Sequence, residues 1–399
     1  MGRAELLQGI RMLRLKDVLS RWESSELSQV EAAEILGMSE RSFRRWCRRW
    51  EEEGDVGLLD RRIGKPSPQQ VPADRAEEMA ELYRTRYAGF TAKHFHEHLQ
   101  RDHGFRWGYS WTKTRLQQLG LVEKAPRKGA HRRKRPRRPL VGMMLHQDGS
   151  RHAWLAGQPA LDLVITLDDA TSQSYSAFLV EEEGTASSFR GLAETIARKG
   201  LPSSLYTDRG SHYFHTPKAG EAVDRKQLTQ LGRALAQLRI EHIAAYSPQA
   251  RGRCERAFGT LQDRLPKELA LAGIADMAAA NRFIAEVYLP QHNARFAVAP
   301  AQAGSAFVAC PPERWRQELC VQEERKVAAD NTVSWHRLKL QIPPSPERPH
   351  YVRATVRVHQ HADGAIELFH GPRRIARYTP DGAPDGAPDE EAQTLKTAA

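Results

Sequence analysis

The sequence contains few cysteines and no long apolar run. Its four cysteines, Cys47, Cys254, Cys310 and Cys320, form no CxxC pair and no paired zinc-binding spacing with histidine. They are therefore expected to be reduced, cytosolic thiols. No segment approaches the roughly 18 apolar residues of a membrane span, and the N-terminus has no apolar signal-peptide core. We therefore expect a soluble, cytoplasmic protein without a membrane partner.

Acidic residues are fewer than basic ones. The 399 residues include 60 Lys and Arg against 49 Asp and Glu, which gives a net charge of +11. This surplus favours a polyanionic partner such as nucleic acid, although a basic surface that only keeps the protein in solution has the same composition. The length allows two to four domains.

Residues 1–65 have the pattern of a helix-turn-helix domain. Ser28 and Glu31 form a capping box that opens a short helix, a turn follows at Gly37, and a second helix is predicted over residues 40–50. The second helix of this motif enters the DNA major groove. A small helical bundle with a solvated basic face is the alternative. The predicted DNA contacts on the second helix are Arg41, Arg44, Arg45, Arg48 and Arg49.

Residues 72–121 predict a second, winged-type helix-turn-helix domain. Its last helix starts near Tyr109, and DNA contacts are predicted from Trp111, Lys113 and Arg115 at the start of that helix. No cysteine lies near the histidines of this region, and successive even positions point around a helix. They are therefore expected to be surface residues and not a metal site. The histidines are His94, His96, His98 and His103.

Residues 122–140 form a basic linker. Such a run does not fold alone and is expected to follow DNA phosphates, which adds salt-dependent affinity. A solvated spacer is the alternative. The linker residues assigned to DNA are Arg132, Arg133, Lys134 and Arg135.

Residues 141–310 predict a mixed α/β domain around three acidic residues. Strands are expected over 141–146, 161–167, 175–180, 202–207 and 241–245, and helices over 185–198, 226–238 and 253–272. Asp148 and Asp208 follow strands, and Glu255 lies early on the last helix. Converging carboxylates repel one another unless divalent cations such as Mg²⁺ or Mn²⁺ lie between them. Two such ions, about 3.5–4 Å apart, can catalyse phosphoryl transfer.

Five motifs carry a resemblance to a known family. They are LHQDGS (145–150), LDDATSQSY (167–175), LYTDRGSHY (205–213), SPQARGRCER (247–256) and LPQHNARFAVAP (289–300). In this order they resemble the DDE transposases of bacterial insertion sequences (ISNCY-type), which have a retroviral-integrase-like catalytic core. The resemblance implies an RNase H-like fold, with Asp148, Asp208 and Glu255 as the catalytic residues and the ligands of two Mg²⁺ or Mn²⁺ ions.

The resemblance also implies a reaction and its partners. Water would cleave the DNA at the transposon end, and the freed 3′-OH would attack the target DNA directly. The partners would be double-stranded DNA, namely terminal inverted repeats and target, and a second copy of the chain in the synaptic complex. The protein would act at the bacterial nucleoid. Many family members have Lys or Arg where this chain has Gln262. The contacts expected near the catalytic helix are Arg251, Arg253, Arg256 and Gln262.

Several alternatives stay open in the sequence. A DNA-binding regulator that has lost cutting, or an RNase H-like nuclease without strand transfer, would share most of these features. His146 could approach substrate or pack within its strand. His212 could approach substrate or lie on a loop surface. Pro266 is expected to kink or break the catalytic helix, well past Glu255.

The C-terminal region changes character. Six short strands are expected within residues 311–379, with a hairpin at Asp363-Gly364, and together they predict a small β-barrel. Residues 380–399 are expected to be a disordered acidic tail. The predicted fold is thus multidomain, with α-helical N-terminal domains, an α/β core and a β-barrel.

Overall fold

A computed structural model describes residues 3–60, 70–124, 135–216, 222–224, 226–246, 252–345 and 348–385. The chain divides into two compact units, Met1–Glu81 and Leu82–Ala399. Predictions for Arg132, Arg133, Lys134 and Arg251 lie outside the described residues, as do those for the loop at 247–251 and for most of the tail. No helix in the described ranges is long and apolar enough to cross a membrane.

The first unit begins with a helical bundle that contains the predicted helix-turn-helix. Its helices are α1 (Arg3–Glu23), α2 (Gln29–Ile35), α3 (Glu40–Glu53) and the short η1 (Gly54–Leu58). The capping box is confirmed, because the Ser28 amide donates to Glu31 at 2.8 Å and the Glu31 amide donates to the Ser28 hydroxyl at 3.3 Å. Leu19 and Phe43 are fully buried in the bundle core.

Helix α4 (Ala73–Thr85) crosses the boundary between the units, and α5 (Ala92–Asp102) and α6 (Tyr109–Gln118) follow it. The prediction of surface histidines on α5 is wrong, because His94, His96 and His98 are only 1%, 3% and 2% exposed. His94 and His98 are four residues apart and therefore lie on the same face of the helix. His96 points elsewhere and its Nδ1 lies 3.1 Å from the Thr112 hydroxyl.

The centre of the second unit is a five-stranded mixed sheet with the order β3-β2-β1-β4-β5. The predicted mixed α/β fold is confirmed. Strands β1 (Leu145–His152), β2 (Leu161–Asp168) and β3 (Ser174–Val180) are antiparallel neighbours, and β4 (Ser204–Thr207) and β5 (Glu241–Ala244) extend the sheet in parallel. The motif at 167–175 forms the turn between β2 and β3, as expected.

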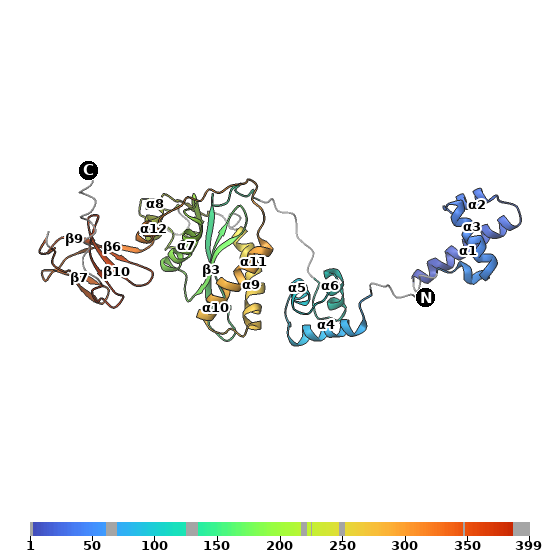
Figure 1. Cartoon of the computed structure of the whole chain (residues 1–399), viewed down its shortest axis with the longest axis horizontal. Helices are drawn as coiled ribbons and strands as arrows, with labels where there is room; N and C mark the ends of the chain where they lie inside the picture. The colour runs from blue at the N-terminus through green and yellow to red at the C-terminus, as the bar shows by residue number, and fades with distance from the viewer. Residues whose placement is uncertain are drawn as a thin grey trace. The chain divides into compact units, whose positions relative to one another are not determined.

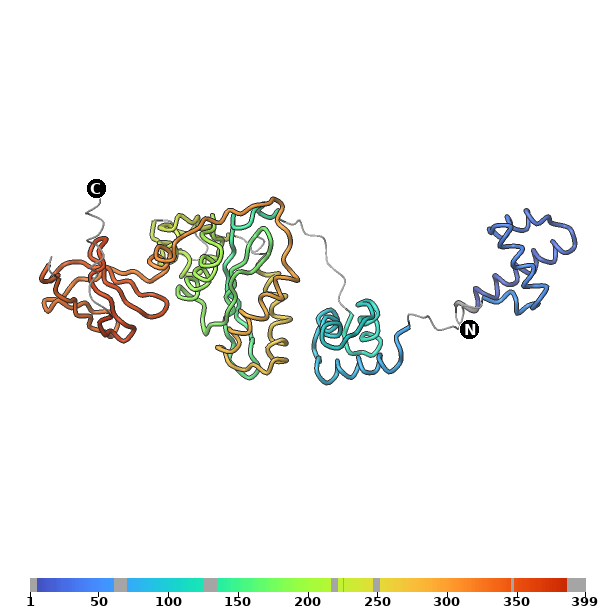
Figure 2. Tube along the Cα trace, in the orientation of Figure 1, coloured from blue at the N-terminus to red at the C-terminus, as the bar shows by residue number. Residues whose placement is uncertain are grey.

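Helices cover both faces of this sheet (Figure 1). Helices α7 (Thr185–Lys199) and α8 (Gln230–Gln237) pack on the face that contains Leu145 and Leu205. The opposite face, which contains Ile165, is covered by α9 (Gly252–Leu271), α10 (Met277–Phe283), η3 (Ile284–Tyr288) and α11 (Leu289–Phe296). Residues 297–310 then return along the sheet, where Val141 pairs with Ser305 and Leu201 with Val308 (Figure 2).

Two local predictions in this domain are corrected. The first strand runs over 145–152 and not over 141–146, because all eight of its residues pair with β2 and Gly142 turns the chain before it with φ +79°. Asp148 therefore lies in the middle of a strand and not after its end. Helix α9 also continues through Pro266 to Leu271 without a break.

The C-terminal region contains α12 (Pro312–Glu318) and six strands around a common apolar core. Among its described residues the strands form an open four-stranded sheet, β11-β10-β9-β6, and a separate pair, β7-β8. A closed barrel is therefore not confirmed, whereas the hairpin at Asp363-Gly364 is present between β9 and β10. The strands are β6 (Val321–Lys326), β7 (Thr332–Trp335), β8 (Leu338–Gln341), β9 (Thr355–Gln360), β10 (Ile366–His370) and β11 (Arg373–Tyr378).

Candidate active site

The pairing of β1 with β4 brings the two predicted aspartates to neighbouring positions. Leu145 aligns with Leu205 and His146 with Tyr206 in parallel register. Asp148 and Asp208 each lie two residues beyond the last pair of this register, so both follow the same end of the β1–β4 ladder. The His146 and Tyr206 rings lie 5.1 Å apart, so they share one face of the sheet. Asp148 points to that face too, since side chains alternate along a strand.

Helix α9 runs alongside β1 on the same face of the sheet, and two contacts indicate how the helix that carries Glu255 lies along the strand. At one point Arg253 Nε lies 2.5 Å from Asp169 Oδ1, which His146 Nε2 also approaches at 2.8 Å. At a second point Gln262 Nε2 donates to the Ser150 hydroxyl at 3.0 Å. The helix rises about 13.5 Å between its two contacts, and the strand advances about 13 Å between its own. On this scale Glu255 lies about 3 Å and Asp148 about 6.6 Å past the first contact, and α9 carries Glu255 along the face of the sheet that contains Asp148.

The three carboxylates differ in exposure. Asp148 is 5% exposed, Asp208 is half-buried and Glu255 is exposed. Asp208 is oriented by the Gly210 amide, which donates to its Oδ1 at 2.8 Å. In the described part of the chain, the carboxylate oxygens of Asp148, Asp208 and Glu255 do not form a group whose members all lie within 4.8 Å of one another.

Asp169 is a buried carboxylate that was not predicted from the sequence, and it contacts residues of several segments near β1. Its side chain is fully buried and contacts His146, Arg135 and Arg253, and it accepts the Arg138 amide at 2.6 Å. Burial raises the pKa of Asp169, but these hydrogen bonds and the Arg253 charge outweigh burial and hold it well below its usual range. In the sequence, the adjacent acids Asp168 and Asp169 of the motif LDDATSQSY were the available signal for this buried carboxylate. His146 is fully buried and contacts Asp169, so its side chain is not open to solvent.

A second carboxylate missed in the sequence, Glu183, lies beside the strand that carries Asp148. It accepts a hydrogen bond from the Tyr213 hydroxyl at 2.9 Å, and His212 Nε2 lies 3.6 Å away. A Cβ at Gly149 would come within 2.2 Å of Glu183 Oε2, so a larger residue next to Asp148 would require the Glu183 side chain to move. Burial raises the pKa of Tyr213 well above its usual value, and the charges of Glu183 and Asp148 add to the effect.

The side chains predicted to contact DNA differ in their exposure and in the residues that they contact. On α3 the side chains of Arg41, Arg44, Arg45 and Arg48 are exposed, whereas Arg49 packs over the Trp46 ring at 4.5 Å and donates to the Leu59 carbonyl at 3.2 Å. On α6 Lys113 is exposed, and Trp111 and Arg115 are half-buried. The guanidinium groups of Arg135 and Arg253 bond Asp169, and Arg256 is exposed next to Glu255.

Comparison with known proteins gives related sequences over most of the chain. A helix-turn-helix domain family matches residues 16–67. The chain is 31% identical over 362 residues to putative transposase y4bF of Sinorhizobium fredii, a match that covers 90% of this chain and 78% of that protein. It is 32% identical over 162 residues to the transposase for insertion sequence IS1202 of Streptococcus pneumoniae, which covers 41% of this chain and 34% of the relative.

Solved structures of viral integrases show a looser likeness. The HTLV-2 integrase catalytic core domain in complex with magnesium (dimeric form) is 16% identical, covers 37% of this chain and 89% of its own, and has a TM-score of 0.28. The simian T-cell lymphotropic virus intasome in complex with PP2A regulatory subunit B56 gamma is also 16% identical, covers 72% and 91%, and has a TM-score of 0.31. Superposition at this level is too loose to bear on mechanism. The sequence relationship alone shows the family: the chain belongs to the transposases of bacterial insertion sequences and has an N-terminal helix-turn-helix domain.

Proposed function

We propose that this chain is an active DDE transposase with an RNase H-like core. It binds the ends of an insertion sequence, cleaves the DNA there and joins the freed 3′-OH to target DNA. The observation that supports this proposal is that Asp148 and Asp208 both lie two residues past the β1–β4 pairs, while α9, which carries Glu255, contacts Asp169 and Ser150.

The donor set fits divalent metal ions. Asp148, Asp208 and Glu255 supply only oxygen ligands, which Mg²⁺ and Mn²⁺ prefer. Two such ions, when bound by Asp148, Asp208 and Glu255, would activate the attacking oxygen and stabilise the leaving one. Each step exchanges one P–O bond for another, first with water and then with the 3′-OH, so no protein nucleophile is needed.

The surrounding residues orient these carboxylates. The Gly210 amide fixes one oxygen of Asp208, and the Gln262–Ser150 hydrogen bond holds α9 along β1. Asp169 keeps Arg253, and with it the first turn of α9, next to His146. Positioning of this kind is worth several kcal/mol in bimolecular reactions such as strand transfer, because the entropy of alignment is lost before the reaction.

DNA contacts are proposed from several parts of the chain. The exposed arginines of α3 would read the major groove, and the start of α6 would contact a second segment of the same DNA end. Arg256 is the proposed contact beside Glu255. Arg135 and Arg253 already bond Asp169, but a guanidinium has five N–H donors and can also reach a phosphate. The linker residues Arg132, Arg133 and Lys134 and the loop residue Arg251 complete the proposed set. Pairing of two DNA ends requires at least two copies of the chain.

The proposal is tested with DNA duplexes taken from the sequences that flank the gene. Purified protein is incubated with each duplex and Mg²⁺ or Mn²⁺, and 3′-end cleavage and joined products are measured. Joining by the native chain and its loss in Glu255→Gln are the expected results. Glu286→Gln, the same change at an exposed carboxylate on η3, serves as the matched control and should retain joining.

Other outcomes separate the alternatives. Cleavage without any joined product would favour a nuclease. Specific binding without either product, at every metal concentration, would favour a DNA-binding regulator.

A further inference from the structure

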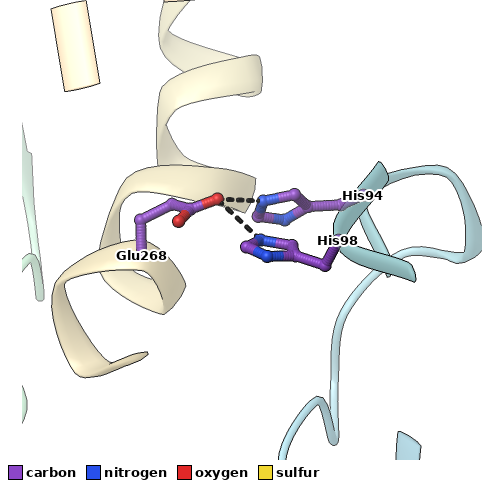
Figure 3. Close-up of side chains that lie close together, drawn as sticks. All are labelled: His94, His98 and Glu268. Carbon is purple, nitrogen blue, oxygen red and sulfur yellow. Dashed lines mark hydrogen bonds and ion pairs between the residues drawn. The ribbon is translucent and has the colours of Figure 1, made fainter. Parts of the chain in front are cut away.

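Helices α5 and α9 meet at a buried cluster of side chains that can bind metal (Figure 3). His94 Nε2 and His98 Nε2 lie 2.6 Å and 2.9 Å from the same oxygen, Glu268 Oε1. The two imidazoles are 2% and 3% exposed, and the Glu268 side chain is 16% exposed. In the described part of the chain this is the one group of three such residues whose ligand atoms all lie within 4.8 Å of one another.

We propose that His94, His98 and Glu268 bind one Zn²⁺ ion. Two imidazole nitrogens and one carboxylate oxygen are a donor set that zinc prefers, whereas Mg²⁺ and Ca²⁺ prefer oxygen ligands alone. Zinc bonds of about 2.0–2.1 Å in tetrahedral geometry separate neighbouring ligand atoms by roughly 3.3 Å. Glu268 would therefore retreat by less than about 1 Å from its present distances to the histidines. A water molecule can occupy the fourth position.

The surroundings of His98 support this assignment. Its second ring nitrogen, Nδ1, lies 2.8 Å from Asp102 Oδ2, which is the carboxylate–histidine–metal arrangement of many zinc sites. Arg101 Nη2 also lies 2.9 Å from His98 Nδ1 and donates to Asp102 at 3.0 Å, so Asp102 and Arg101 together hold the orientation of the ring. His94 Nδ1 is buried and has no hydrogen-bond partner among the described residues.

The proposed ion would join two parts of the transposase. Its histidines come from the module that carries α6, and its carboxylate comes from the helix that carries Glu255, thirteen residues earlier or about 20 Å along the axis. A neighbouring contact already links the same helices, because Arg264 donates to both oxygens of Glu97 at 2.7 Å and 3.0 Å. Zinc would fix α5 on the catalytic helix at a point remote from the catalytic carboxylates.

The experiment measures metal content of the full chain. Protein is stripped with a chelator, loaded with Zn²⁺, passed through gel filtration and analysed by mass spectrometry. One zinc per chain is expected, with the same result in Asp208→Asn, which weakens binding at the catalytic acids. His98→Gln and Glu268→Gln should lose the ion. His96→Gln, at an equally buried histidine of α5 that contacts Thr112, should retain it.

Two further measurements protect the test from folding defects. Asp102→Asn keeps all three ligands and should weaken zinc binding by about 10- to 100-fold. Co²⁺ in place of zinc should give a visible absorption band in the native chain that is absent in His98→Gln. Retention of zinc by His98→Gln, absence of zinc from the native chain, or its loss in Asp208→Asn would each overturn the proposal. The cluster would then be a hydrogen-bonded joint without a metal.

Discussion

Helix α9 carries two glutamates that the fold treats in opposite ways. Glu255, in the first turn, is exposed to solvent. Glu268 contacts His94 and His98, and although burial raises its pKa, the hydrogen bonds from both histidines outweigh burial and bring the pKa to about 2. Glu255 is thus open to solvent, whereas Glu268 is enclosed by two histidines of α5. The surroundings of the same residue type on one helix therefore depend on what the tertiary fold brings next to it.

The largest effect is expected where the carboxylate is exposed. Glu255→Gln removes a charge that faces the proposed metals, so joining should fall by at least about 10²–10³-fold. Thermal unfolding of the variant should match the native chain, because an exposed side chain contributes little to stability. Joining assays and calorimetry on the same preparation check both statements. A clear loss of stability would break the contrast with Glu268.

Asp169 extends the contrast to a fully buried carboxylate that two arginines and His146 contact. Asp169→Asn leaves Arg253 and Arg135 without their shared counter-charge, and removal of one partner from a buried ionic cluster costs about 3–5 kcal/mol. Amide hydrogen exchange in β1 measures the loss. Asp263→Asn, in the surface pair with Lys267, is the comparison and should cost no more than about 1 kcal/mol. Equal effects would show that burial is not what distinguishes these acids.

Glu367, in the C-terminal region, tests the same chemistry outside the core. Burial raises its pKa, but hydrogen bonds from His361, Gln317 and Arg374 outweigh burial and lower the pKa from the ordinary 4.5 to about 2. Because the folded-state pKa is depressed, this stabilisation is complete above about pH 4.5 and is lost as the pH falls through 2. Glu367→Gln should therefore weaken hydrogen-exchange protection of β10 at pH 7 by about 1.5–3 kcal/mol.

The pH series supplies its own control. The difference between the native chain and Glu367→Gln should shrink between pH 4.5 and pH 2, since the native carboxylate becomes protonated there. A difference that stays constant over this range would mean that the carboxylate is not held as a charged acceptor.

The smallest effect is expected at Gln262, on the side of α9 that carries Glu255. Gln262→Ala removes the hydrogen bond to Ser150, and a neutral hydrogen bond of this kind is worth about 0.5–1.5 kcal/mol. Joining should slow modestly, because the helix is still held by Arg253 at its first turn. Kinetic assays beside the Glu255 variant give the measurement. Full loss of joining would make Gln262 a substrate contact and not only a positioning residue.

Much of the fold was predictable because its signals are local. The capping box at Ser28, the stripe through Phe43 and the order of strands and helices around the three acids depend on short-range spacing. The errors have a physical cause as well. Residues 141–144 are apolar but precede the strand, and the strand continues into polar residues because β2 pairs with all of them. The closed C-terminal barrel was expected from strand content, which does not specify which edges pair.

The buried polar clusters could not be predicted in this way. His94 and His98 were predicted to be surface residues, because their carboxylate partner, Glu268, lies at least 170 residues away in sequence. Asp169 was missed for the same reason, because its partners Arg135, His146 and Arg253 come from the linker, from β1 and from α9.

The sequence by itself determined the family of this protein, the order of its elements and the three acids proposed for catalysis, because motifs and periodicity are properties of neighbouring residues. Only the tertiary structure decided which other charges are buried together. Charge pairing between distant segments depends on how the helices dock on the sheet, and spacing along the chain does not contain that information.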